Sequence, residues 1–191
     1  MSARKENNMF VKVCGLTTKE QIDKAIAYGY DAIGIVTYAK SKRYCSDQKA
    51  MQLAGYAKGR IKSFVVGLTY GDVQNVADLF DYIQIYEARP VPNLVLASRE
   101  MPAADITYEY FIYDASIGSG IFHKFPQWLK AMSGKVIVAG GLTIGNVCTV
   151  IQDIKPFGVD VSSGVEKDGV KDFGMMQAFI NAVRNCHPDG C

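Results

Sequence analysis

Two side chains that could do acid–base chemistry share one face of the short apolar segment Val11–Thr17. Strand alternation puts Lys12 and Cys14 on the same face and the neighbouring valines on the other. A charge on a buried strand is costly unless that face offers partners for it. A free thiol ionises at about pH 8.5, so Cys14 needs a cationic or donor-rich neighbourhood to act as a base. Lys12, one layer deeper, could help, although a lone cysteine at a strand end is more often an inert core residue.

A second candidate is the aspartate that closes the apolar run Phe111–Asp114. An aspartate here can be a helix cap, a loop ligand or, at the end of a strand, a general acid or base. To donate a proton, Asp114 needs partial burial that favours its protonated form.

Two segments rich in glycine and serine have the composition of a phosphate site. Their backbone N–H groups and hydroxyls belong to Gly140, Gly141, Ser162, Ser163 and Gly164. Such groups bind oxyanions when a turn exposes them. One glycine pair is weak evidence because tight turns need glycine anyway, but both segments together predict phosphate binding.

These residues lie at or after the ends of short apolar runs that predict strands. Most runs are nearly continuous in Val, Ile and Phe, as expected for strands covered on both faces. The eight predicted strands are Phe10–Cys14, Ala32–Val36, Ser63–Leu68, Tyr82–Tyr86, Asn93–Ala97, Tyr110–Asp114, Val136–Ala139 and Val159–Ser162.

Amphipathic patterns between most of these runs predict helices. Thr17 with Glu20 has the spacing of a capping box, and Gly29 ends that helix. Ser46 can cap the next one. The other apolar stripes are Val73, Val76, Ala77 and Phe80 after Asp72; Ile144, Val147, Ile151 and Ile154 before Pro156; and Met176, Phe179, Ile180 and Val183 after Asp172.

Eight strands alternating with helices predict an α/β fold, a (β/α)8 TIM barrel. In such barrels the chemistry sits at the carboxyl ends of the strands, and phosphate sites commonly follow strands seven and eight. Gly140 and Gly141 follow the seventh predicted strand; Ser162 ends the eighth, and Ser163 and Gly164 follow it. The barrel therefore brings the phosphate segments to the same rim as Cys14 and Asp114.

The barrel is short, because such folds typically take about 250 residues and this chain has 191. The link Glu87–Pro92 holds two prolines, so helix 4 is predicted to be missing. The link Arg99–Glu109 contains Pro102 and has room for one or two irregular turns, so helix 5 is predicted to be reduced. The outer face of strands four and five would then lack its usual cover, and a second copy in a homodimer could supply it.

Length and composition indicate a single domain over 1–191, with the barrel over 9–185 and tails at 1–8 and 186–191. The net charge is +2 and no block of like charge occurs, which argues against nucleic acid or an anionic membrane as the main partner. No run of apolar residues is long enough to span a membrane. The polar N-terminus lacks the apolar core of a signal peptide, so a cytoplasmic location is expected.

The cysteines and histidines predict neither a disulfide framework nor a metal site. The five cysteines are scattered, and the close pair is Cys186 and Cys191. The two histidines, His123 and His187, give no zinc-binding spacing.

Several motifs, in the correct order, resemble those of the phosphoribosylanthranilate isomerase family of tryptophan biosynthesis. The resemblance runs in register from about Val11 to Arg184. The segments that carry it are Lys12–Thr17, Tyr38–Tyr44, Ala139–Leu142 with Asn146 and Val147, and Gly158–Glu166 with Gly169–Asp172.

The resemblance implies an Amadori rearrangement of N-(5'-phosphoribosyl)anthranilate to 1-(2-carboxyphenylamino)-1-deoxyribulose 5-phosphate, which needs one acid, one base and no cofactor. The motifs give the base role to Cys14 and the acid role to Asp114. They imply that Arg43 binds the anthranilate carboxylate, since a guanidinium can bind both oxygens of that group. They also imply that Asp160 orients either Arg43 or the anthranilate amine. From the residues alone, Arg43 could be a solvated loop charge and Asp160 a structural ion pair.

The chain also departs from the family pattern. The family usually has Gln-Leu-His-Gly where this chain has Gln84–Glu87, so Tyr86 replaces the histidine and Glu87 the glycine. Gly118–Gly120 is what remains of a Gly-Gly-Thr-Gly loop, and Lys124 lies near the position of an aspartate.

Two other functions stay open: isomerisation of a related phosphosugar, and a non-catalytic barrel that binds a phosphorylated ligand. Retention of both Cys14 and Asp114 favours an enzyme, because phosphate binding needs neither. Arg43 favours an aromatic acid over a bare phosphosugar.

Overall fold

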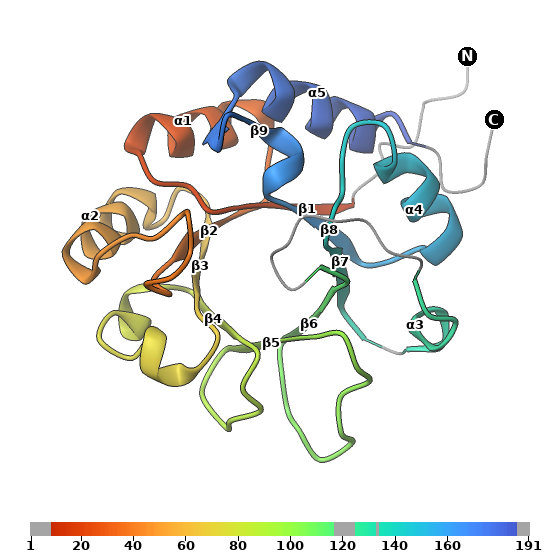
Figure 1. Cartoon of the computed structure of the whole chain (residues 1–191), viewed down its shortest axis with the longest axis horizontal. Coiled ribbons are helices and arrows are strands. Elements are labelled where there is room, and N and C mark those ends of the chain that lie inside the picture. The colour runs from red at the N-terminus through yellow and green to blue at the C-terminus, as the bar shows by residue number, and fades with distance from the viewer. Residues whose placement is uncertain (1–8, 117–124, 133, 187–191) are drawn as a thin grey trace.

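The computed structural model describes residues 9–116, 125–132 and 134–186. Eight parallel strands close into a barrel in the order of the sequence (Figure 1), so the predicted (β/α)8 TIM barrel is confirmed. The strands are β1 (Phe10–Cys14), β2 (Ala32–Val36), β3 (Lys62–Val66), β4 (Tyr82–Ile85), β5 (Leu94–Ser98), β6 (Tyr110–Asp114), β7 (Val136–Ala139) and β8 (Gly158–Val161). Four of them have the predicted bounds, and the other four are shifted by one or two residues.

Helices cover the barrel unevenly. They are α1 (Lys19–Tyr28), α2 (Asp47–Ala57), the short α3 (Trp128–Ala131), α4 (Val147–Ile154) and α5 (Phe173–Arg184). The capping box of α1 uses Thr18 and Gln21 rather than Thr17 and Glu20. The reason is that the buried Gln21 side chain accepts the N–H groups of both Thr17 and Thr18. Ser46 caps α2 as predicted, and Asp172 caps α5.

The segment after β3 folds differently from its apolar pattern. It forms two 3-10 turns, η1 (Tyr70–Asp72) and η2 (Ala77–Leu79), rather than an α-helix. The Asp72 carboxylate accepts the N–H groups of Leu68 and Thr69, which fixes a tight turn at the start of the segment. The apolar stripe after Asp72 is still buried. The prediction that it packs in the core is therefore confirmed, and the prediction that it forms a helix is wrong.

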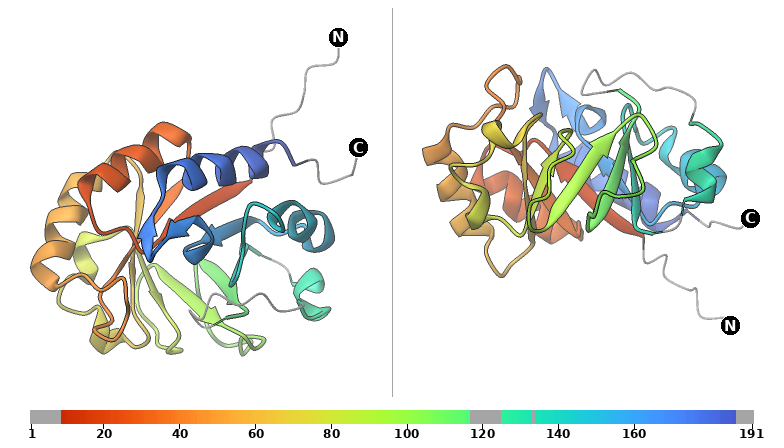
Figure 2. Two further views of the ribbon diagram at one scale, coloured as in Figure 1. Left: turned by 45° about the horizontal axis from the view of Figure 1, so that its top comes forward. Right: turned by 90° about the horizontal axis from the view of Figure 1, so that it is seen from below.

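Helix 4 is missing, as predicted, and the segment between β5 and β6 has no helix either. Among the described residues, only loops stand outside β5 (Figure 2, right), while Trp128 of α3 packs on the outer face of β6. These loops nevertheless bury the outer face of the strands, because Ile106 and Tyr108 pack on the core that contains Leu94 and Leu96. The face therefore lacks its usual helix, as expected, but the loops cover it, so a second copy is not needed for that purpose.

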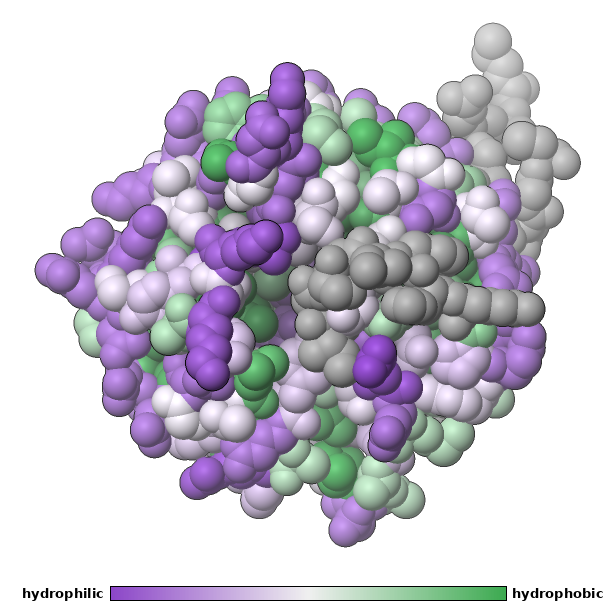
Figure 3. Space-filling model, in the orientation of Figure 1, coloured by the Kyte–Doolittle hydropathy of each residue, from purple (hydrophilic) through white to green (hydrophobic). Residues whose placement is uncertain are grey.

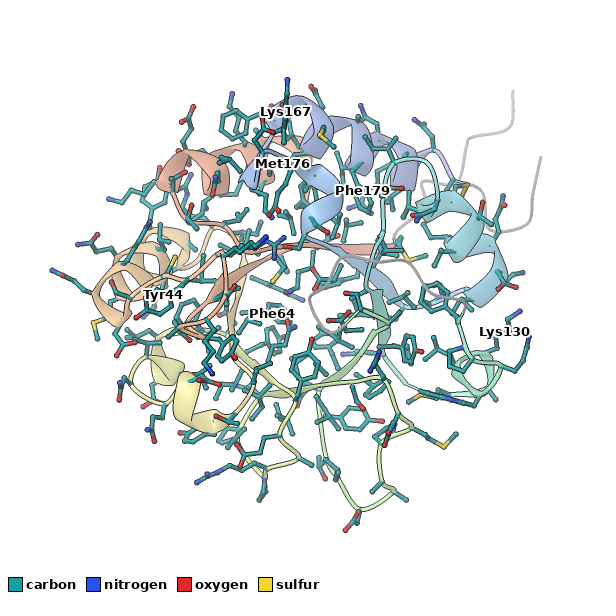
Figure 4. All side chains as sticks on the ribbon, viewed as in Figure 1. Tyr44, Phe64, Lys130, Lys167, Met176 and Phe179 are labelled. Atoms are coloured by element: carbon teal, nitrogen blue, oxygen red, sulfur yellow. A yellow bond between two sulfur atoms is a disulfide. The ribbon has the colours of Figure 1, made fainter. Side chains whose placement is uncertain are left out.

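Aromatic rings close the amino-terminal end of the barrel. Phe10, Tyr82 and Tyr110 begin β1, β4 and β6, and Phe64 lies inside the barrel beside them (Figure 4). The ring centroids of Phe64 and Tyr82 are 4.8 Å apart, and those of Tyr82 and Tyr110 are 5.2 Å apart. This packing leaves the carboxyl end as the open end of the barrel.

A disulfide joins Cys148 on α4 to Cys186, just after α5. The sequence did not predict it, because the two residues are 38 positions apart and meet only when α4 and α5 pack side by side. Cys191 lies outside the described residues. No helix in the described part of the chain is long and apolar enough to cross a membrane.

Candidate active site

A cavity of about 730 Å³ opens at the carboxyl ends of the strands. Its volume is within the range of small-molecule sites. Most of the predicted site residues line it: Cys14, Arg43, Asp114, Gly140, Gly141, Asp160, Ser162 and Ser163. Hydrophilic side chains rim this end of the molecule, with hydrophobic surface between them (Figure 3). The barrel thus gathers residues that are far apart in the sequence.

A buried ion pair forms the floor of the site. The β1–β8 register pairs Lys12 with Asp160, and the Lys12 Nζ lies 2.8 Å from Asp160 Oδ2. Lys12 is fully buried and its ammonium lies over the Phe64 ring. Asp160 makes no hydrogen bond to Arg43 among the described residues, although the orientation of Arg43 was one of the two roles considered for it. Its other oxygen, Oδ1, is buried without a protein partner among the described residues.

Cys14 lies directly beside Lys12. A methyl group added at Gly34 of β2 would come 2.7 Å from Cys14 Sγ and 3.1 Å from Lys12 Nζ, so the glycine leaves room for both. Burial raises the pKa of Cys14, and the Lys12 charge only partly offsets this. Burial lowers the pKa of Lys12, but Asp160 and Cys14 outweigh it and raise the pKa above the usual value. The resting site thus pairs a protonated lysine with a thiol that needs help to ionise.

Asp114 ends β6 and is held at both oxygens. Oδ1 accepts the N–H and the O–H of Ser116, each at 2.9 Å. Oδ2 accepts the phenol O–H of Tyr86 at 2.5 Å. The side chain is buried but faces the same cavity as Cys14. A carboxyl and a thiol are therefore presented to one ligand.

Arg43 is held by a carboxylate that the sequence reasoning did not single out. Glu166 accepts Arg43 Nε at 2.6 Å and Nη2 at 2.7 Å, and it also binds the buried Lys171. Burial raises the pKa of Glu166, but the hydrogen bonds from Arg43 and Lys171 outweigh it and lower the pKa below the usual value. The stem of Arg43 crosses Gly15, where a Cβ would lie 2.2 Å from Arg43 Cδ. Arg43 is therefore a fixed charge at the cavity rim and not a solvated one.

The two predicted phosphate segments adopt the expected turns. Gly140 and Gly141 have φ of 91° and 69°, which favour glycine. Asn146 supports this turn, since its Nδ2 donates to Gly141 O and its Oδ1 accepts the Thr143 N–H. Gly164 instead packs against Leu142 and is not among the residues that line the cavity.

The hydroxyl of Ser162 is already engaged within the protein. It donates to Cys14 O at 2.9 Å, and Lys171 Nζ donates to it at 3.3 Å. Lys171 also donates to Ser162 O at 3.1 Å. The ammonium of Lys171 thus lies directly behind the turn that follows β8.

Three contributing residues, Tyr86, Glu166 and Lys171, were not assigned roles from the sequence. Glu166 and Lys171 lie in segments that resemble family motifs, and Tyr86 stood out only as a departure. Gly118–Gly120 and Lys124 lie outside the described residues. In the described part of the chain, no group of three or more His, Cys, Asp or Glu side chains could hold a metal ion.

Comparison with known proteins gives a consistent result. A family model described as N-(5'phosphoribosyl)anthranilate (PRA) isomerase matches residues 120–182. An N-(5'-phosphoribosyl)anthranilate isomerase of Ralstonia nicotianae is 30% identical over 211 residues, covering 91% of this chain and 92% of the relative. One from Streptococcus pneumoniae is 33% identical over 191 residues, covering 92% and 96%.

Solved structures agree with the sequence relatives. TrpF from Jonesia denitrificans superimposes with a TM-score of 0.77 at 30% identity, covering 94% of this chain and 99% of the other. A phosphoribosyl anthranilate isomerase from Thermus thermophilus gives 0.77 at 26% identity, covering 92% and 98%.

Proposed function

The chain belongs to the N-(5'-phosphoribosyl)anthranilate isomerase family, and from this premise we propose that Cys14 and Asp114 are the base and the acid of its reaction. The chain is an isomerase of tryptophan biosynthesis. The observation that carries the assignment is that the Cys14 thiol and the Asp114 carboxyl face one cavity, with Arg43 and the β7 and β8 turns on its rim.

The rearrangement converts N-(5'-phosphoribosyl)anthranilate into 1-(2-carboxyphenylamino)-1-deoxyribulose 5-phosphate through two proton transfers by the protein, followed by tautomerisation. Asp114 gives its proton to the ribose ring oxygen, the bond from that oxygen to C1' breaks, and the nitrogen lone pair forms a Schiff base. Cys14 then takes the proton from C2', and the electron pair of that bond neutralises the Schiff base to give an enolamine. Tautomerisation of the enolamine yields the ketone. No electrons leave the substrate, so the residues need only to move protons.

Cys14 needs the Lys12 cation to act as a base. The thiolate that takes the C2' proton must form inside a buried site, which disfavours it. The neighbouring ammonium, itself held by Asp160, favours the charged sulfur. Asp160 lines the cavity, and its buried Oδ1 has no protein partner in the described structure, which leaves this oxygen as an acceptor for the substrate amine N–H.

The phosphate of the substrate binds between the turns after β7 and β8, at Gly140, Gly141, Ser162 and Ser163, which line the cavity. The turns supply backbone N–H groups, and the Lys171 ammonium behind Ser162 adds a positive charge. Arg43 binds the anthranilate carboxylate. Glu166 occupies the Nε and Nη2 side of its guanidinium, and Nη1 has no recorded partner among the described residues. The carboxylate therefore approaches from the Nη1 side.

The activity test follows the loss of anthranilate-type fluorescence when the purified protein meets the substrate. Cys14→Ser and Asp114→Asn keep the shape of the site but each removes one proton-transfer group, so each should lower kcat at least about a hundredfold. Arg43→Ala should chiefly raise KM, because it removes binding shared by ground and transition states. Near-normal turnover in Cys14→Ser would remove the assigned base, and near-normal turnover in Asp114→Asn would remove the acid.

We further propose that the protein is cytoplasmic and forms a homodimer. The cytoplasm suits a biosynthetic enzyme that acts on a phosphorylated metabolite. The ground for a dimer is a shallow apolar groove of about 310 Å³ between the β5–β6 loop and α3, beside Met101, which is 59% exposed. A second copy of the chain would bury this groove.

A further inference from the structure

Tyr86 follows β4 directly, and its phenol reaches the general acid. Its O–H lies 2.5 Å from Asp114 Oδ2, while Ser116 holds Oδ1 through two donors. The resemblance assigns no role to a tyrosine here, because the family usually has a histidine at this position. The contact is therefore a property of this chain.

We propose that Tyr86 is the positioning residue of the general acid, holding Asp114 Oδ2 in place and stabilising the carboxylate that remains when Asp114 gives up its proton. This inference rests on the proposed function of Asp114. Negative charge develops on the carboxyl group as the proton moves to the ring oxygen. A donor that is already aimed at that oxygen stabilises the charge without reorganisation.

Tyr86 is suited to be a permanent donor. Burial raises the pKa of Tyr86 far above its usual value, and the charge of Asp114 adds to this effect. The phenol therefore keeps its proton throughout the working pH range. A histidine at this position would change its charge near neutral pH.

Packing leaves the Asp114 carboxyl little freedom to turn away from Tyr86. A Cβ at Gly140 would lie 2.8 Å from Asp114 Oδ1 and 2.7 Å from the Ser116 backbone nitrogen. The turn after β7 therefore lies close against the Oδ1 side of the carboxyl. Ser116 and Gly140 thus confine one oxygen, and Tyr86 fixes the other. Both oxygens of the Asp114 carboxyl are therefore held in place, including the one that donates the proton.

Glu87, which also departs from the family pattern, helps to hold Tyr86 in place. The N–H groups of Tyr86 and Glu87 both donate to Leu68 O, at 3.0 Å and 3.1 Å. Glu87, which replaces a glycine of the family, accepts the Tyr70 N–H at 2.7 Å. These bonds tie the end of β4 to the segment around η1 and hold the Tyr86 backbone. A fixed backbone keeps the phenol within reach of Asp114.

Tyr86→Phe tests the proposal because it removes only the hydroxyl. A hydrogen bond to a charged group contributes enough for kcat to fall about 10- to 100-fold when it is lost. KM should change less than about threefold, since the hydroxyl acts through Asp114. The carbon-13 chemical shift of the Asp114 carboxyl should change, because Oδ2 loses its donor. Carbon-13 NMR of aspartate-labelled protein reads this directly, with Asp114→Asn identifying the signal.

Tyr30→Phe is the matched control. Tyr30 donates a buried hydrogen bond to Met176 O at 2.8 Å, between α1 and α5 and outside the cavity. Tyr30→Phe should lower the melting temperature about as much as Tyr86→Phe and leave both kcat and the Asp114 carbon-13 signal unchanged. A loss of kcat in Tyr86→Phe without a change in the Asp114 carbon-13 signal would show a merely structural role and overturn the proposal, as would unchanged kcat. Near-normal turnover in Asp114→Asn would instead overturn the proposed function itself.

Discussion

Lys12 has two roles in the site. It is fully buried, it forms the ion pair with Asp160, and its ammonium lies beside the Cys14 thiol. A buried pair costs more to break than it contributes relative to an apolar pair, since the remaining charge has no solvent. The β1–β8 register places the partners side by side, so neither can reach water by a simple rotation. The site therefore depends on this pair for its shape as well as its charge.

Lys12→Met should lower the free energy of unfolding by about 3–5 kcal/mol, because it leaves the Asp160 carboxylate buried and unpaired. The double variant Lys12→Met with Asp160→Leu should recover much of that loss, since it removes both charges. Chemical denaturation measures both. If the single variant were as stable as the wild type, the pair would have no structural role.

The burial of Cys14 should control the pH at which its thiol ionises. Burial raises the pKa of Cys14 more than the Lys12 charge lowers it. The thiolate should therefore form only above the usual value of about 8.5 for a thiol, and kcat/KM should depend on pH through that step. Thiolate absorbance of the wild type minus that of Cys14→Ser isolates the group from Cys45, the other described free cysteine. Ionisation of Cys14 below about pH 8 would contradict the dominance of burial.

At the scale of elements, the turn after β7 connects the proposed phosphate site to the acid. Gly140 has φ of 91°, and its missing side chain lets the turn lie against the backbone nitrogens of Ala115 and Ser116. The two loops are in contact because β6 and β7 are neighbours in the barrel. A change in one turn is therefore transmitted to Asp114.

Gly140→Ala should destabilise the fold by about 1–3 kcal/mol, because of the unfavourable φ and the contacts below 3 Å. It should also raise KM by displacing the phosphate turn. Gly55→Ala is the matched control: Gly55 lies within α2 with no atom near a new Cβ, so alanine should stabilise by about 0.5–1 kcal/mol and leave KM unchanged. Thermal melts and steady-state kinetics of the pair test this. An unchanged KM in Gly140→Ala would separate the turn from phosphate binding.

For the molecule as a whole, the loops that replace helices 4 and 5 decide which surface is available to a partner. They already bury the outer face of β5, so a dimer is not needed to cover the barrel. What remains is the apolar groove beside Met101. The fold therefore closes within one chain, and association would use the loops.

Sedimentation velocity should show a dimer whose population rises with protein concentration, because the groove is lined by apolar side chains. Met101→Lys should shift the population toward the monomer without lowering the melting temperature, since Met101 is mostly exposed. A single monomeric species at every concentration would exclude the dimer.

The sequence by itself determined the local features of this protein. The strands follow from continuous apolar runs, the missing helix 4 from two prolines, and the phosphate turns from glycines, since each depends on neighbours in the chain. Cys14 and Asp114 were identified because they end such strands. These properties are local and therefore readable from the chain.

The tertiary structure alone decided which partners these residues have. Arg43 meets Glu166 across 123 positions, Lys12 meets Asp160 across 148, and Tyr86 meets Asp114 across 28. Barrel closure sets these pairs through the register of neighbouring strands and the approach of loops, which no local pattern contains. The 3-10 turns after β3 are different, because Asp72 accepts the N–H groups of Leu68 and Thr69, its near neighbours in the chain, and this local turn replaces the start of the predicted helix.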